Sequence, residues 1–297
     1  MVLLVQTGVR AEEVRQAAEH TLFVEGRSED GLDVSVLSEL LWKTKVVVRP
    51  MGPSYHIKST AQALHPYHPN YYFLIDRDYH DDNEVESSWK SFPNPSAHNL
   101  IIWKRRELEN YFLIPEYFVR SSYATCTVQE VQRILREEAH KRVYMDAANL
   151  AIIHIRQALK EKWIELFDSI TGFETESQAQ SKLIQVTAWE NHRTKSKNTL
   201  KRETIERFFR QYVNTLLGGE PIPTIGKGQW MELMAGKVLF NCLLTKCIKV
   251  RDNNGVQMHG DLARREFVRE LLRLPNHEQP DDFRKLYELV NARVASA

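Results

Sequence analysis

The 297-residue sequence has few cysteines, and their spacing excludes two common roles. Cys126, Cys242 and Cys247 are odd in number and form no CxxC pair, so we expect neither a disulfide framework nor a zinc site. No apolar run approaches the roughly 18–20 residues of a membrane helix, and no basic residue precedes the short apolar patch at residues 2–5. These features predict a cytoplasmic protein with reduced thiols and no membrane association.

Two further groups of motifs are absent. The eleven histidines show no HxH or HExxH spacing, so none is expected to bind metal. No Walker motif occurs, so any ATP hydrolysis linked to this chain must be performed by another protein.

The net charge is only +1, but residues 1–118 hold 17 acidic and 12 basic residues, which leaves 22 acidic and 28 basic in the remainder. An acidic half beside a basic half suits a metal site that faces a polyanion, although chance gives the same asymmetry.

Apolar strands alternate with helical stretches in the first third of the chain. Strands are predicted at residues 21–24, 45–49, 71–75 and 99–103, and helices at about 30–42 and 57–64. Residues 81–97 are polar and contain proline, and we expect a surface excursion there. Strands separated by helices predict an α/β fold, with a mainly parallel sheet and helices on both faces.

After about residue 115 the pattern becomes helical. Helical periodicity covers residues 128–141, 147–168, 201–217 and 260–272, with little that resembles a strand. The sequence therefore predicts an α/β domain at 1–118, followed by a mostly helical region at 119–297 that packs on or near the active site.

Acidic residues follow two of the predicted strands. Glu25 and Glu29 come after the first strand, and Asp76 and Asp78 after the third. In a parallel sheet, functional groups gather beyond the carboxyl ends of the strands. Crowded carboxylates are unfavourable unless a cation neutralises them, and Mg²⁺ prefers such oxygen ligands. If the third strand continued, Asp76 and Asp78 would point to the same side.

A structural explanation exists for each acid alone, because acids at strand ends are often helix N-caps or turn residues, and Asp30 is expected to be one of these. The DxD pair by itself is a weak signal. The joint pattern, in which one strand leads to Glu-Gly and a later one to DxD, is much more specific. It also argues against an aspartyl-phosphate phosphatase, whose DxD nucleophile would follow the first strand.

The segments FVEG, FLIDRD and KRRELENYFL, in this order, resemble the TOPRIM domain of the OLD-family nucleases. They are most similar to the single-domain TOPRIM effectors of the PARIS anti-phage systems, over roughly residues 20–120. The resemblance implies a compact Rossmann-like sheet. It makes Glu25 the catalytic acid or base and a metal ligand, and it makes Glu29, Asp76 and Asp78 further ligands of Mg²⁺, or alternatively of Mn²⁺.

Two more site residues follow from the resemblance. Related families carry a similar Glu-Asn-Tyr segment, so Glu109 is a candidate metal ligand; the alternative is a helix start where Glu109 and Asn110 bond to backbone. OLD-like nucleases also have a Gly-Lys pair near the C-terminus that stabilises transition-state charge, which places Lys237 in the site. The alternative for Lys237 is an ordinary solvated helix lysine.

Basic residues near the predicted site are candidates for substrate phosphate binding. Lys104, Arg105 and Arg106 follow the fourth strand, and an ordinary solvated cluster is the equal alternative for them. Lys58 follows the second strand, where a plain turn without phosphate contact is the favoured alternative. The basic run at residues 191–198 is predicted to be a solvated loop, with nucleic-acid contact as the alternative.

The resemblance implies a nuclease effector of bacterial defence against phage. Its expected partners are an ABC-type ATPase that holds it silent until infection, a nucleic-acid substrate in which tRNA is favoured over DNA, and a second copy in an active homodimer. Two other hypotheses remain: a DNA-nicking nuclease like the OLD proteins, and a non-catalytic module that docks on an ATPase.

Overall fold

The computed structural model describes residues 20–65, 67–78, 80–94, 99–159, 178–179, 181, 185, 187–252 and 254–295. The chain divides into two compact units, one formed by Met1–His140 with Gln229–Ala297 and the other by Lys141–Gly228. This division differs from the predicted boundary at residue 118. The physical reason is that the C-terminal helices pack on the sheet-containing unit, whereas the middle of the chain folds on itself.

A four-stranded sheet forms the centre of the first unit. Its strands are β1 (Thr21–Val24), β2 (Val47–Pro50), β3 (Tyr71–Ile75) and β4 (Leu100–Ile102), in the order β2-β1-β3-β4. All three pairings are parallel, which confirms the predicted α/β class and parallel sheet. Every residue of β1 and β3 is buried, as is expected when helices cover both faces.

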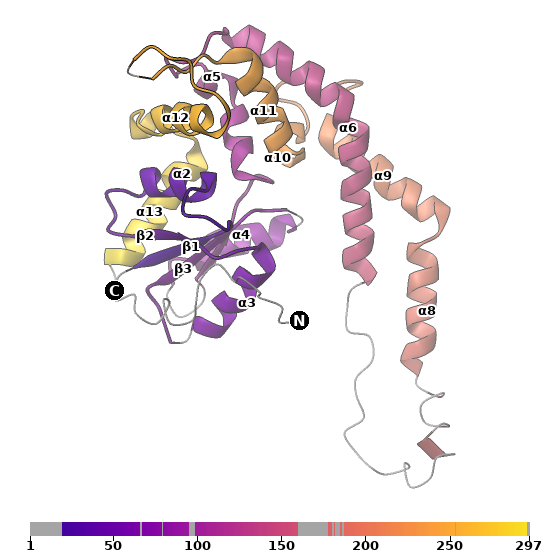
Figure 1. Ribbon diagram of the computed structural model, residues 1–297. Helices are drawn as coiled ribbons and strands as arrows, with labels where there is room; N and C mark the ends of the chain where they lie inside the picture. Colours follow the sequence, from indigo (N-terminus) through magenta and orange to yellow (C-terminus); the bar gives the residue numbers. More distant parts are fainter. Residues whose placement is uncertain are drawn as a thin grey trace, which may run out of the picture. The chain divides into compact units, whose positions relative to one another are not determined.

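Helices connect the strands. They are α2 (Leu32–Leu40), α3 (Ser54–Leu64) and α4 (Asp82–Ser91). The chain moves from β1 to β2 in one direction and from β2 to β3 in the other, so right-handed crossovers put α2 and α3 on opposite faces of the sheet (Figure 1).

The prediction of a surface excursion over residues 81–97 is wrong for its first part, which is α4. Asp81 caps this helix by accepting a hydrogen bond from the Glu84 amide at 2.8 Å. Val85 and Trp89, four residues apart, are buried, and the Trp89 indole donates to the Ile102 carbonyl at 2.7 Å. Two apolar residues at helical spacing are therefore enough to dock this otherwise polar helix beside β4.

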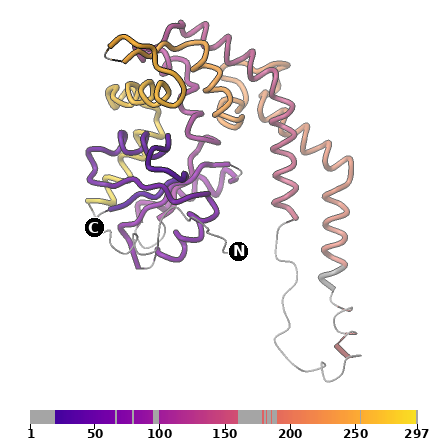
Figure 2. The backbone as a smooth tube through the Cα atoms, in the orientation of Figure 1, coloured from indigo at the N-terminus to yellow at the C-terminus, as the bar shows by residue number. Residues whose placement is uncertain are grey.

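The rest of the first unit comes from two distant parts of the chain. After β4 follow the 3-10 helix η1 (Leu108–Leu113) and α5 (Pro115–Phe118). The C-terminal part supplies α10 (Trp230–Leu233), α11 (Gly236–Cys247), α12 (Gly260–Leu272), η2 (Asn276–Glu278) and α13 (Asp281–Ala295). The tube in Figure 2 shows the late, yellow segments beside the early, indigo ones. α11 packs on η1 and α12 on α2, and Phe112 stacks on Phe240 with ring centroids 5.4 Å apart.

A buried arginine fastens α13 to the sheet. Arg293 is only 2% exposed, and its guanidinium lies 5.1 Å from the ring centre of Tyr72 and 4.9 Å from that of Phe92. It donates to the carbonyls of Phe92 and, at 2.9 Å, Pro69. Cation–π contacts and carbonyl acceptors together compensate for the desolvation of this charge.

The second unit is helical. α6 (Val128–Leu159) begins in the first unit and continues into the second, where α8 (Thr187–Thr199) and α9 (Arg202–Leu217) follow. One continuous helix replaces the two predicted at 128–141 and 147–168, and the end of the latter lies outside the described residues. The predicted loop at 191–198 is instead part of α8. Among the described helices, none has both the length and the apolar character of a membrane span.

Candidate functional site

The candidate site lies where the strand order of the sheet reverses. β1 has β2 on one side and β3 on the other, so the chain leaves the carboxyl ends of β1 and β3 toward opposite faces. Glu25 follows β1 and Asp76 follows β3, and a Glu25 Oε1 atom accepts a hydrogen bond from the Asp76 amide at 3.0 Å. The two residues that the sequence placed on separate strands therefore meet directly.

Two glycines fix the backbone beside Glu25. The Gly26 amide donates to the Gly52 carbonyl at 3.2 Å, and the Gly52 amide returns a bond to the Gly26 carbonyl at 2.7 Å. Gly26 has φ 135° and Gly52 has φ 95°, backbone angles that residues other than glycine rarely adopt. The paired turns tie the end of β1 to the end of β2, so the backbone at Glu25 is held in one position.

Asp78 reaches the site through a strained turn. β3 ends at Ile75, so the strand does not continue through Asp76 and Asp78, and the expectation that they point to the same side does not apply. Asp78 has φ 41°, and its amide donates to the Arg106 carbonyl at 3.2 Å. Burial raises the pKa of the Asp78 carboxyl, and the charge of Arg106 partly offsets that effect. A non-glycine residue in this conformation is a feature that often accompanies function.

Lys237 supplies a cation to the acidic residues. It is the second residue of α11, and its Nζ lies 3.9 Å from a carboxylate oxygen of Asp76. A positive charge at a helix N-terminus opposes the helix dipole, so helix stability does not explain its place. Burial lowers the pKa of Lys237, but Glu109, Asp76, Glu107 and Asp33 together raise it above its usual value, so the ammonium stays charged.

The carboxylic acids of the site have raised pKa values. Burial is the main cause for each: it raises the pKa of Glu25 and of Glu109 to about 7, and that of Asp76 well above its usual range. The charge of Asp33 raises the pKa of all three further, while that of Lys237 lowers it. Desolvated acids with perturbed pKa values at the end of a sheet are typical of functional sites.

Sequence reasoning missed two members of this group. Asp33 lies in the first turn of α2, and burial raises its pKa, while the charge of Lys237 partly offsets that effect. Glu107 precedes η1 and accepts a hydrogen bond from the Lys237 amide at 2.8 Å. Residues 26–31 between Glu25 and α2 are not helical, so no periodicity in the sequence links Asp33 to Glu25.

Glu29 lies differently from the other predicted ligands. Its side chain is 64% exposed and faces Arg49, with 3.8 Å between the charged atoms. Gly31 is the N-cap of α2, and Asp30 lies in the turn before it, as the turn alternative expected. Glu109, in contrast, is only 4% exposed and belongs to the acidic group, whereas Asn110 beside it binds backbone. Asn110 therefore matches the helix-start alternative, while Glu109 is one of the buried acids near Lys237.

The predicted phosphate-binding residues are all engaged by protein groups. Lys58 lies 4.0 Å from Glu84, and Lys104 lies 3.5 Å from Glu86. Arg105 donates to the Asn110 carbonyl at 3.0 Å. Arg106 is only 9% exposed and donates to the Leu233 carbonyl at 3.3 Å, so it ties η1 to α10.

Among the described residues, no group of three or more His, Cys, Asp or Glu side chains has the geometry to hold a metal ion. Glu25 and Asp76 instead point at protein donors, the Asp76 amide and the Lys237 ammonium. Any ion held here would require these side chains to turn from those donors.

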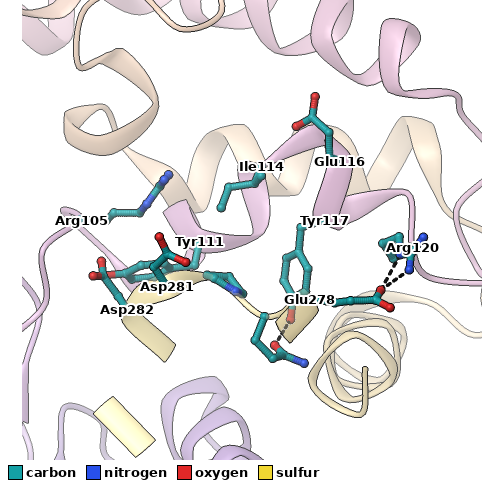
Figure 3. A pocket seen from close by; sticks show the side chains of 11 residues that line it. Arg105, Tyr111, Ile114, Glu116, Tyr117, Arg120, Glu278, Asp281 and Asp282 are labelled. Carbon is teal, nitrogen blue, oxygen red and sulfur yellow. Dashed lines mark hydrogen bonds and ion pairs between the residues drawn. The ribbon is translucent and has the colours of Figure 1, made fainter. Parts of the chain in front are cut away.

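A cavity of about 700 Å³ is lined by none of the acids of the candidate site. Figure 3 shows Tyr117 and Arg105 pointing into it, together with the bond between Arg120 and Glu278. Tyr117 donates to the Gln279 side chain at 2.6 Å. Arg105 is the one residue that this cavity shares with the predicted substrate-binding set.

No protein-family model matches the chain, and no curated protein matches it in sequence.

Proposed function

We propose that the chain is a Mg²⁺-dependent nuclease of the TOPRIM type that cleaves phosphodiester bonds. The observation that carries this proposal is the meeting of Glu25 and Asp76 at the switch point of the sheet, with the Lys237 ammonium 3.9 Å from Asp76. A carboxylate pair with a lysine at the carboxyl ends of parallel strands suits phosphoryl transfer better than simple ligand binding.

The charge of the site favours a divalent cation. Six carboxyl groups influence one another here, and Lys237, Arg106 and His80 oppose their charge. The carboxyl groups belong to Glu25, Asp33, Asp76, Asp78, Glu107 and Glu109. Hard oxygen donors with excess negative charge fit Mg²⁺, and Mn²⁺ has similar preferences. Glu25, Asp76 and Asp78 would hold the ion, with Asp33 or Glu109 completing the set. When bound, the ion would neutralise charge on the phosphate and on the leaving oxygen.

The protein groups have separate tasks in this proposal. Burial raises the pKa of Glu25 to about 7, which suits a general base or acid near neutral pH. Glu25 would orient the attacking hydroxyl or water and accept its proton. Lys237 would place its ammonium near the non-bridging oxygens of the phosphate, where negative charge develops in the transition state.

The biological setting is a further part of the proposal. The resemblance to TOPRIM effectors of anti-phage systems favours a toxin that cleaves tRNA and that an ABC-type ATPase keeps inactive. It also favours a homodimer as the active form. An OLD-like nuclease that nicks DNA differs only in substrate, so cleavage assays distinguish the two.

The proposal is tested with Glu25→Gln, which keeps the size of the side chain but cannot take up a proton. Wild-type and variant protein are incubated with tRNA and with supercoiled plasmid, with Mg²⁺ or with EDTA, together with the activated ATPase partner where one is encoded nearby. Glu137→Gln is the matched control, because Glu137 is an exposed carboxylate that pairs with Arg133. We expect Glu25→Gln to lower cleavage by about 10²-fold or more, and Glu137→Gln to leave it unchanged.

A non-catalytic docking module is the second candidate. It is favoured by the way Glu25 and Asp76 already bond to protein donors, as structural acids do. In that case Glu25→Gln would keep all of the activity or toxicity of the wild type, and this outcome would reject the nuclease proposal.

A further inference from the structure

We propose that Asn110 is a positioning residue that holds Lys237 in place over Asp76. For its catalytic consequence this inference rests on the nuclease proposed above. It joins two short motifs, Glu-Asn and Gly-Lys, that lie 126 residues apart between Asn110 and Gly236. The structure brings them into direct contact.

Asn110 uses its whole side chain to hold the junction of α10 and α11. It is fully buried, and its Nδ2 donates to the carbonyls of Met231 at 2.9 Å and Met234 at 3.1 Å. Its Oδ1 accepts a hydrogen bond from the Glu107 amide at 3.0 Å. An asparagine is required because the site needs two donors and an acceptor on one short side chain.

Gly236 allows the junction to come this close. A Cβ atom at this position would fall 2.6 Å from Asn110 Cγ and 2.9 Å from the Asn110 backbone nitrogen, and closer still to Oδ1. Any side chain would therefore push α11 away from η1. The close approach of Asn110 therefore explains why a glycine stands at position 236, directly before Lys237.

Glu107 completes the attachment. The N-cap of α11 is Ala235, whose side chain cannot cap, and the carboxylate of Glu107 accepts from the Lys237 amide instead. The amide of Glu107 is itself held by Asn110. The Lys237 amide is therefore held by Glu107 directly and by Asn110 through Glu107.

This anchoring matters because the lysine side chain has little else to fix it. Lys237 is 54% exposed, and its ion pair with Asp76 is long, at 3.9 Å. A long ion pair of a half-exposed lysine contributes little to stability, so the ion pair alone does not hold the ammonium in one place. The backbone position set by Asn110 determines whether Nζ reaches the site.

The test is a double-mutant cycle of Asn110→Ala and Lys237→Ala, measured as Mg²⁺-dependent cleavage. Asn110 touches no substrate, so we expect Asn110→Ala to lower kcat by about 10²-fold, as a displacement of about 1 Å can do, with KM little changed. In the Lys237→Ala background the same substitution should have almost no further effect. Asn99→Ala is the matched control, because Asn99 is also buried and its Nδ2 donates to the Tyr71 carbonyl at 3.1 Å. If Asn110→Ala and Lys237→Ala lower kcat independently, the inference is overturned.

A second measurement needs no activity. We expect hydrogen exchange of the Lys237 amide to be faster by roughly tenfold in Asn110→Ala, but not in Asn99→Ala. Should Asn110→Ala fail to fold, Asn110→Asp replaces it, because it keeps the size and the acceptor but turns an oxygen toward two carbonyls. Unchanged exchange at Lys237 overturns the inference. If wild type lacks cleavage but the exchange result holds, the nuclease proposal fails and the positioning role of Asn110 stands.

Discussion

Burial of Glu109 makes the stability of the sheet-containing unit depend on pH in an unusual direction. Its pKa is raised from 4.5 to about 7, mainly because the carboxyl is buried at 4% exposure. Between these values the folded protein keeps a proton that the unfolded chain has lost. The stabilisation is therefore complete below about pH 4.5 and is lost as the pH rises through 7.

The size of the effect follows from the pKa. A pKa shift of one unit corresponds to about 1.4 kcal/mol, so Glu109 alone costs the folded state at most about 3.5 kcal/mol at pH 8. When one acid ionises, the protonation of the neighbouring acids around Lys237 changes as well. We therefore expect a total destabilisation of about 1–3 kcal/mol at pH 8. Glu109→Gln, which stays neutral, should be more stable than wild type by that amount at pH 8 and about equally stable at pH 4.5.

The assay is native-state hydrogen exchange of the β3 amides at pH values from 5 to 8, because these amides report on the opening of the first unit alone. Measurements with EDTA give the pH dependence of the protein alone, and measurements with Mg²⁺ show what the ion adds to it. A bound cation would favour the ionised acids, so Mg²⁺ should stabilise the wild type more at pH 8 than at pH 5.

Two results would refute this reasoning. If β3 is equally stable or more stable at pH 8 than at pH 5 in EDTA, burial does not govern the acids of the site. If Glu109→Gln follows the wild type at every pH, Glu109 is ionised throughout. In either case the perturbed acids no longer support a functional site.

Two other substitutions test the structure at different places. Arg293→Ala should lower the free energy of unfolding by about 2–4 kcal/mol in urea denaturation, because it leaves the buried Phe92 carbonyl and the part-buried Pro69 carbonyl without this donor and a void between two rings. Arg284→Ala on the same helix removes an exposed pair with Asp281 and should cost less than about 0.5 kcal/mol. Asp33→Asn should weaken Mg²⁺ binding, measured by calorimetry, by about tenfold or more, whereas Glu29→Ala should change it little because that side chain faces Arg49. A larger loss with Glu29→Ala would show that the start of α2 rearranges around the ion.

Much of the sheet could be predicted because its strands are short apolar runs between breaks. Tyr71–Ile75 and Thr21–Val24 have the predicted bounds, and so does the helix Gly260–Leu272. The helix at Asp82–Ser91 was missed because its surface is polar and only Val85, Ser88 and Trp89 are buried. Periodicity cannot detect a helix whose apolar face is two side chains wide.

The site could be predicted only where position along a strand determines position in space. Glu25 and Asp76 meet because both follow adjacent parallel strands, a relation that the sequence contains. The place of the Asp33 side chain depends on the residue at which α2 begins, and a sequence pattern gives helix bounds only to within a few residues. Arg106 depends on a tertiary contact with α10, so its burial is not visible in a basic run that resembles a solvated cluster.

The C-terminal helices therefore belong to the site and are not an appendage to the sheet. The sheet supplies Glu25 and Asp76, but α11 carries the lysine that pairs with Asp76, and its contact with η1 fixes that lysine. Burial is the leading cause of the raised pKa at Glu25, Asp76 and Glu109 alike. A domain that ended at residue 118 would keep all three acids but would lose Lys237 and the packing of α11 on η1. The chemistry of this site depends on segments more than one hundred residues apart, which is why the first unit is built from both ends of the chain.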